Sequence, residues 1–150
     1  MRNAGVSTAV RLSVESRAAG CCEYCLAQSR YASDPFTIDH ILPISRGGSN
    51  ASENLAFSCS GCNGRKHAAI ETPDPVTGIP TRLFNPRLDR WSDHFRWNEE
   101  FDRMIPLTSS GRATVNRLAL NRPGLVELRR VLRNNGVHPP ATSQLPDARI

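Results

Sequence analysis

Two cysteine pairs with the same spacing are the residues best suited to chemistry in this chain of 150 residues. Cys22 and Cys25 form one C-x-x-C pair, and Cys59 and Cys62 form the other. Each pair can place two thiolates on one ion, so the four sulfurs can close a tetrahedral zinc site. Zinc held by four thiolates has no open position for water, and we therefore expect this ion to be structural.

A fifth cysteine, Cys21, leaves one alternative open. Cys21 could replace Cys22 as a ligand, through a C-x-x-x-C spacing to Cys25. We favour Cys22, because its spacing matches that of the second pair. Paired spacing without a visible export signal or membrane-length apolar run favours metal over disulfides. It also predicts a cytoplasmic protein with no membrane partner.

Polar residues beside the cysteine pairs are suited to phosphodiester chemistry. Asp39 and Asn63 offer hard oxygen donors, which suit Mg²⁺ or Mn²⁺ and not the zinc. Such an ion would offset charge that develops on a phosphate. His40 can take a proton from water near neutral pH. Because neighbours in a strand point to opposite faces, Asp39 and His40 converge only if the strand twists or ends there.

The segment from Cys22 to Lys66 resembles the HNH nuclease family, in the variant with Asn at the last signature position. The matching residues, in the family's order, are Cys22, Cys25, Asp39-His40, Pro43, Gly47-Gly48, Asn54-Leu55, Cys59, Cys62 and Asn63. The resemblance implies that His40 activates the attacking water, while Asp39 and Asn63 hold the divalent ion. It also implies that Asn54 orients the loop through hydrogen bonds. Many members carry His where this chain has Asn63, which bears on the preferred metal and the rate.

The elements that must position these residues follow from periodicity and turn chemistry. Apolar residues at four-residue spacing predict a helix over residues 7–19, which Gly20 ends. Alternation predicts a strand over residues 36–41, and a short return strand follows over residues 54–58. A helix is expected from residue 61 to about residue 70. Zinc would join the strand to the first turn of this helix without a large core.

The rest of the chain reads as an extension that follows this module. Its expected parts are a turn-filled linker over 71–80, strands over 91–97 and 103–107, helices over 108–120 and 121–136, and a disordered tail over 137–150. The sequence therefore predicts an α+β fold: a small ββα-metal core framed by four cysteines, with an N-terminal helix and a C-terminal strand-plus-helices extension. We expect one domain over 1–150, with the nuclease module at about 20–70 and the extension at about 80–136.

The net charge of +5 and the pI of about 9.3 favour a polyanionic partner. Lys66, Arg65 and Arg46 are the candidate phosphate contacts, because they lie beside the signature residues. The sequence thus predicts a metal-dependent endonuclease that hydrolyses phosphodiester bonds, with DNA favoured over RNA. Two alternatives remain: a zinc-stabilised module that binds nucleic acid without cutting it, and a zinc-stabilised protein-interaction domain.

Overall fold

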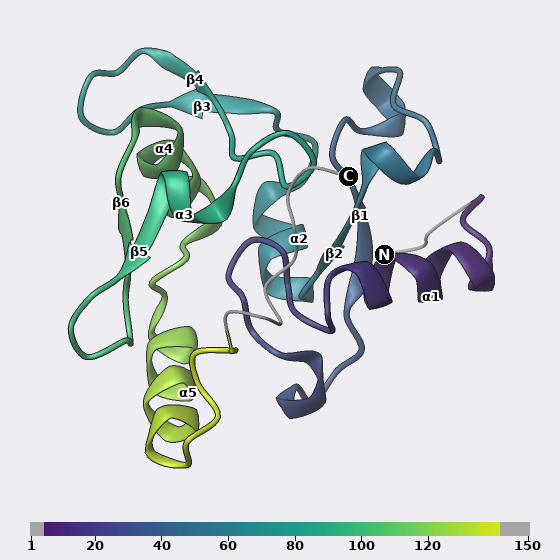
Figure 1. The fold of residues 1–150 in the computed structure, drawn as a ribbon. Coiled ribbons are helices and arrows are strands. Elements are labelled where there is room, and N and C mark those ends of the chain that lie inside the picture. The colour runs from purple at the N-terminus through teal and green to yellow at the C-terminus, as the bar shows by residue number, and fades with distance from the viewer. Residues whose placement is uncertain (1–4, 142–150) are drawn as a thin grey trace.

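The fold is known from a computed structural model that describes residues 5–141. This part of the chain contains five α-helices and three two-stranded antiparallel sheets, so the fold is α+β as the sequence predicts (Figure 1). The N-terminal helix, the first hairpin and the following helix form one group. The other two hairpins and the last helices form the C-terminal extension.

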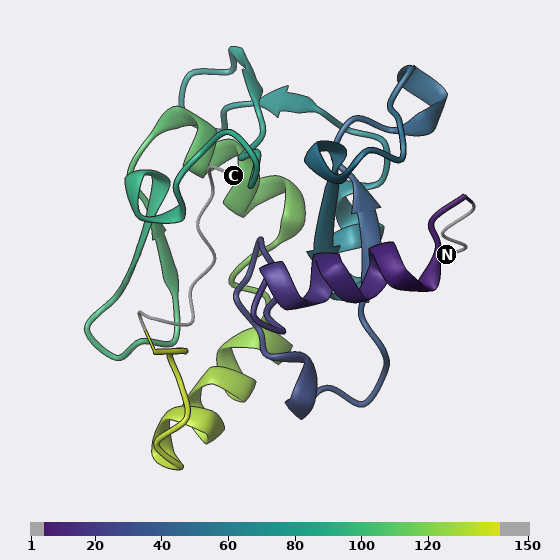
Figure 2. The same cartoon turned by 45° about the vertical axis from the view of Figure 1, so that its right-hand side comes forward.

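Helix α1 (Thr8–Arg17) begins where the sequence indicates, because the Ser7 hydroxyl accepts a hydrogen bond from the Val10 N–H and caps the helix. Its buried residue, Val14, belongs to the hydrophobic core. Arg17, in the last turn, donates to the carbonyl oxygens of Ser52 and Leu55. Helix α1 therefore lies across the first hairpin and is tied to it by both apolar and polar contacts (Figure 2).

The ββα core is made of β1 (Thr37–His40), β2 (Leu55–Ser58) and α2 (Ser60–Lys66). The strands pair antiparallel, with Thr37 opposite Ser58 and His40 opposite Leu55. Helix α2 ends at Lys66, well before residue 70, because His67 adopts a positive φ of 51° and turns the chain away. The predicted helix is therefore too long at its C-terminal end.

A hairpin replaces the turn-filled linker that the sequence predicts over residues 71–80. Strands β3 (Glu71–Pro73) and β4 (Pro80–Arg82) pair antiparallel. The turn between them is closed by buried Asp74, whose carboxylate accepts hydrogen bonds from the Val76 N–H and the Thr77 hydroxyl. The Pro-rich composition is thus compatible with short strands that end at the prolines.

The extension continues through four more elements and a final helix. They are α3 (Trp91–His94), β5 (Phe95–Trp97), β6 (Met104–Pro106), α4 (Ser109–Leu118) and α5 (Pro123–Asn134). The predicted strand from Trp91 begins instead as a helical turn. Thr108, the first residue of the predicted helix over 108–120, caps α4 by accepting a hydrogen bond from the Gly111 N–H. Asn121 does not cap α5, because its amide bonds the backbone of Met104.

One cluster of buried side chains includes residues of both the ββα core and the extension. Its members include Val14, Tyr24, Ile38, Leu55, Phe57, Phe84, Phe95, Met104, Leu118 and Leu125. A buried ion pair between Glu23 and Arg87 also joins the two segments.

The expected tail disorder does not extend over residues 137–141: the His138 ring is buried against Trp97 and bonds the Phe101 carbonyl. The rest of the expected tail, residues 142–150, lies outside the described residues.

Candidate functional site

Four buried cysteines meet at the junction of the N-terminal knuckle and α2. The sulfurs of Cys22, Cys25, Cys59 and Cys62 all lie within 4.8 Å of one another, and those of Cys25 and Cys59 are 3.8 Å apart. Zinc–sulfur bonds of about 2.3 Å place tetrahedral sulfurs about 3.8 Å apart, so the cluster is close to the size of a four-thiolate zinc site. This four-cysteine cluster is the frame that the spacing predicts.

Cys21 is not part of the cluster, which settles the alternative ligand set in favour of Cys22. The Cys21 thiol lies 3.6 Å from the Ala19 carbonyl. Burial raises the pKa of the Cys21 thiol to about 11, which opposes the thiolate form that a metal requires.

Burial and mutual hydrogen bonds perturb the pKa values of the thiols in the cluster. Hydrogen bonds from the Cys22, Cys25 and Cys62 side chains lower the pKa of Cys59. Burial raises the pKa of Cys22 well above its usual value. A bound divalent cation supplies the charge that the buried thiolates need, so metal binding and proton release are coupled here.

Asn54 holds the loop between β1 and β2 closed. Its amide oxygen accepts from the Leu42 N–H at 2.8 Å, and its amide nitrogen donates to the carbonyls of Leu42 and Ser49 at 2.9 and 2.8 Å. Gly48 is required at this point, since a Cβ there would lie 1.7 Å from the Leu42 oxygen. These bonds are the loop-orienting contacts that the resemblance implies for Asn54.

His40 is the last residue of β1 and is partly exposed. Its Nε2 lies 2.7 Å from the Asn50 amide oxygen. An amide oxygen only accepts hydrogen bonds, so this contact assigns Nε2 as the donor, and in the neutral ring Nδ1 then carries the lone pair. Sequence reasoning missed Asn50, although it lies in the same Gly-rich loop as the signature glycines.

Asp39 leaves β1 on the opposite face from His40. Strand β1 ends at His40, but its pairing with β2 is unbroken up to that residue: His40 pairs with Leu55, and the Ile41 N–H donates to the Asn54 carbonyl. The buried Asp39 carboxylate accepts from the Tyr24 hydroxyl at 2.6 Å. Burial raises the pKa of Asp39, while Lys66 and Tyr24 act against that rise. The proposed reaction requires the side chains of Asp39 and His40 to reach the same phosphate. The geometry of β1 alone does not bring them together.

Lys66 points into the protein, which corrects its predicted role as a phosphate contact. Its side chain is 2% exposed, and its ammonium lies 3.2 Å from Asp39 Oδ2. The same ammonium lies 3.4 Å from the His40 carbonyl and 3.2 Å from the Ile41 carbonyl. Arg65 and Arg46 are exposed, as nucleic-acid contacts require.

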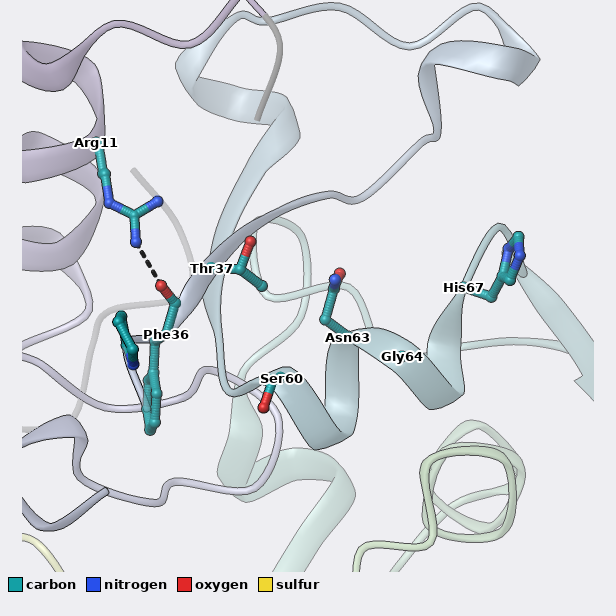
Figure 3. Close-up of a pocket in the computed structure, with 8 residues that line it drawn as sticks. Arg11, Phe36, Thr37, Ser60, Asn63, Gly64 and His67 are labelled. Atoms are coloured by element: carbon teal, nitrogen blue, oxygen red, sulfur yellow. Dashed lines mark hydrogen bonds between the residues drawn. The ribbon is translucent and has the colours of Figure 1, made fainter. Parts of the chain in front are cut away.

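A cavity of about 410 Å³ opens beside Asn63, between α1, β1 and α2 (Figure 3). Its lining residues are Arg11, Pro35, Phe36, Thr37, Ser60, Asn63, Gly64 and His67. Figure 3 shows Asn63 on α2 next to Thr37 on β1, with His67 just beyond the end of α2. Arg11 reaches in from α1 and donates to the Phe36 carbonyl. Arg11, Thr37 and Ser60 are possible ligand contacts that sequence reasoning missed, because none lies in a recognisable motif.

The predicted divalent-ion ligands are compatible with a hard cation by donor chemistry. Asp39 lies on β1 and Asn63 on α2, two elements that contact each other, and both residues carry oxygen donors. In the structure the Lys66 ammonium already offsets the Asp39 charge. A divalent ion at Asp39 would therefore have to displace this ammonium.

Comparison with known proteins identifies one segment of the chain. Residues 22–69 match the family model described as HNH endonuclease. No curated protein and no solved structure matches the chain. In residues 5–141, none of the helices has the length and apolar character that crossing a membrane requires. The segment that matches the HNH endonuclease family model is therefore the one that holds the four-cysteine cluster, the β1–β2 hairpin and α2.

Proposed function

We propose that this protein is a metal-dependent endonuclease that hydrolyses phosphodiester bonds of nucleic acid, with DNA favoured over RNA. One observation carries the proposal. In an HNH domain, the partly exposed His40 is bonded through Nε2 to Asn50, which leaves the Nδ1 lone pair for a water molecule.

His40 is the general base of this reaction. Its Nδ1 takes a proton from the water that attacks the phosphorus atom. The Nε2–H bond to Asn50 limits rotation of the ring, so the basic nitrogen keeps one direction. The closed loop supports this pair, because Asn54 fixes the backbone on both sides of the segment that carries Asn50.

Asp39 and Asn63 would hold the divalent ion, Mg²⁺ or Mn²⁺. When bound, the ion would neutralise charge that develops on the phosphate and its leaving oxygen. Lys66 and Tyr24 keep the Asp39 carboxylate in place before the ion arrives. Asn63 borders the cavity, where Arg11, Thr37 and Ser60 offer donors to phosphate oxygens.

The nucleic acid would follow the exposed basic residues of this surface. Arg65 on α2 and Arg46 in the β1–β2 loop would contact phosphates, with Arg11 in the cavity. The net charge of +5 supports attraction to a polyanion. Four cysteines arranged to hold zinc as thiolates suit a reducing compartment such as the cytoplasm.

A zinc-stabilised module that binds nucleic acid without cutting it is the second candidate function. The observation that favours it concerns Asp39. Its carboxylate is buried, pairs with the Lys66 ammonium and accepts a hydrogen bond from the Tyr24 hydroxyl. If no divalent ion displaces Lys66 from Asp39, the exposed arginines would still bind phosphates, but the phosphodiester bond would not be hydrolysed.

Nicking of supercoiled plasmid separates the two candidates. The endonuclease cuts in Mg²⁺ or Mn²⁺ and stops when these ions are chelated while zinc is retained. His40→Ala should abolish nicking, whereas His94→Gln, in the extension, should not. A protein that binds plasmid but never nicks it in either ion is the binding module.

A further inference from the structure

Arg122 points its guanidinium at the sulfurs of the second cysteine pair. Its Nη2 lies 3.6 Å from Cys59 Sγ and 3.9 Å from Cys62 Sγ, and its Nη1 lies 3.7 Å from Cys62 Sγ. Nη1 also donates to the carbonyls of Leu118 and Ala119, at 3.0 and 3.3 Å. The guanidinium therefore bridges the four-cysteine cluster and the C-terminal end of α4.

Gly61 leaves the space that this guanidinium occupies. A Cβ at Gly61 would lie 2.5 Å from Arg122 Nη2 and 3.1 Å from its Cζ. Gly64, in the same helix, has nothing within 4 Å of the position of a Cβ. The glycine inside the second C-x-x-C pair is thus matched to a side chain far along the sequence.

The charge of the cluster explains why an arginine lies there. Four thiolates around one Zn²⁺ leave net negative charge in a buried site. Arginine remains charged and offers several N–H donors in a fixed plane, so it can bond two sulfurs and still reach carbonyl oxygens. Hydrogen bonds to metal ligands from surrounding residues change metal affinity by about 10–100-fold.

We propose that Arg122 is an outer-sphere residue of the zinc site, where it donates N–H···S hydrogen bonds to Cys59 and Cys62 and slows zinc loss. Through the same side chain, the junction between α4 and α5 is held against the cluster. This role rests on the four-cysteine zinc site alone. It holds whether or not the protein cuts nucleic acid.

Zinc release and cobalt spectra test the role of the guanidinium. Zinc-loaded Arg122→Gln, challenged with excess chromophoric chelator, should release zinc about 10–100-fold faster than wild type. In the cobalt-substituted protein, the thiolate-to-cobalt charge-transfer band should shift, because the sulfurs lose hydrogen-bond donors. Arg122→Lys keeps the positive charge but lacks the planar guanidinium with its several donors. Its zinc release rate should lie between those of wild type and Arg122→Gln. Arg130→Gln, on α5 and paired with Asp102 and Glu127, should behave as wild type.

A substitution at Gly61 tests the same proposal independently, because it leaves Arg122 unchanged. Gly61→Ala should displace the guanidinium and speed zinc release as Arg122→Gln does, and the double variant should add little more. Gly64→Ala should release zinc at the wild-type rate. If Arg122→Gln does not fold, the Gly61→Ala and Arg122→Lys variants decide the question. The proposal is overturned if the folded variants keep both the wild-type release rate and the wild-type cobalt band.

Discussion

The ammonium of Lys66 lies 3.2 Å from Asp39 Oδ2, with both side chains almost completely buried. The chain thus supplies its own cation at the carboxylate that is expected to hold a divalent ion. Helix α2 carries both Lys66 and Asn63, so one helix carries the proposed oxygen donor for the ion and the charge that would compete with it. This pairing makes the state of Asp39 the main question about the site.

Removal of the Lys66 charge should destabilise the fold. Lys66→Met leaves the Asp39 carboxylate buried without a cation, which costs about 3–5 kcal/mol for a broken buried pair. Urea unfolding of wild type and variant measures the loss. The double variant Asp39→Asn with Lys66→Met should recover part of it, because no unpaired charge remains. A single variant as stable as wild type would show that the pair contributes little.

The same substitution should strengthen binding of a divalent ion. In Lys66→Met the ion no longer has to displace an ammonium from Asp39, so Mn²⁺ should bind more tightly than to wild type. Electron paramagnetic resonance of free Mn²⁺ in a titration measures the affinity. The matched control is the double variant with Asp39→Asn, which lacks the carboxylate and should lose the gain. Equal Mn²⁺ affinity in wild type and Lys66→Met would mean that the ion does not use Asp39.

Zinc and folding should be lost together. Cys25→Ser or Cys59→Ser removes one of four ligands, and the purified protein should lose its zinc and its cooperative melting transition. Cys21→Ser, outside the cluster, should keep about one zinc per chain. Metal analysis and thermal melts report both properties. Wild-type protein that is fully folded without zinc would refute this prediction.

Asp74, in the turn of the β3–β4 hairpin, should make the free energy of unfolding depend on pH in the acidic range. Hydrogen bonds from Arg112 lower the pKa of Asp74. A lowered pKa stabilises the folded state above the unfolded value of about 3.9, and this stability is lost as the pH falls toward the folded value. Asp74→Asn should therefore be less stable than wild type at pH 7, and the difference should shrink in acid. Urea midpoints across this range test it, with the exposed Asp93→Asn as the charge control.

Local patterns predicted the parts of the fold that local contacts determine. The two C-x-x-C pairs predicted the cluster, and Ser7 and Thr108 marked helix starts, because ligand spacing and capping act over a few residues. Lys66 was misplaced because three-residue spacing puts it on the face of Asn63, but spacing does not tell which face is buried.

Contacts between distant segments could not be predicted in this way. Arg112 reaches the turn at Asp74, and Arg122 reaches the sulfurs of Cys59 and Cys62, across long stretches of sequence. The hairpin over 71–82 and the arginine at the zinc site both depend on such contacts. Strand geometry, by contrast, predicts opposite faces for Asp39 and His40 from their adjacency alone, and both residues pair with β2.

Binding and cleavage should separate at His40. If Nδ1 takes the proton from the attacking water, His40→Ala should lose on the order of 10²–10⁴-fold in the rate of cleavage at saturating nucleic acid. Affinity should change little, because it comes mainly from arginine contacts to phosphate and weakens with salt.

Asn50→Ala should lose part of the rate, since the ring is no longer held through Nε2. Arg46→Ala should show the reverse pattern: weaker binding of nucleic acid, but a nearly normal cleavage rate at saturation. Single-turnover nicking and filter binding measure the two properties on the same substrate. A His40→Ala protein that binds far more weakly yet cuts at the wild-type rate once saturated would make His40 a binding residue and remove the proposed base.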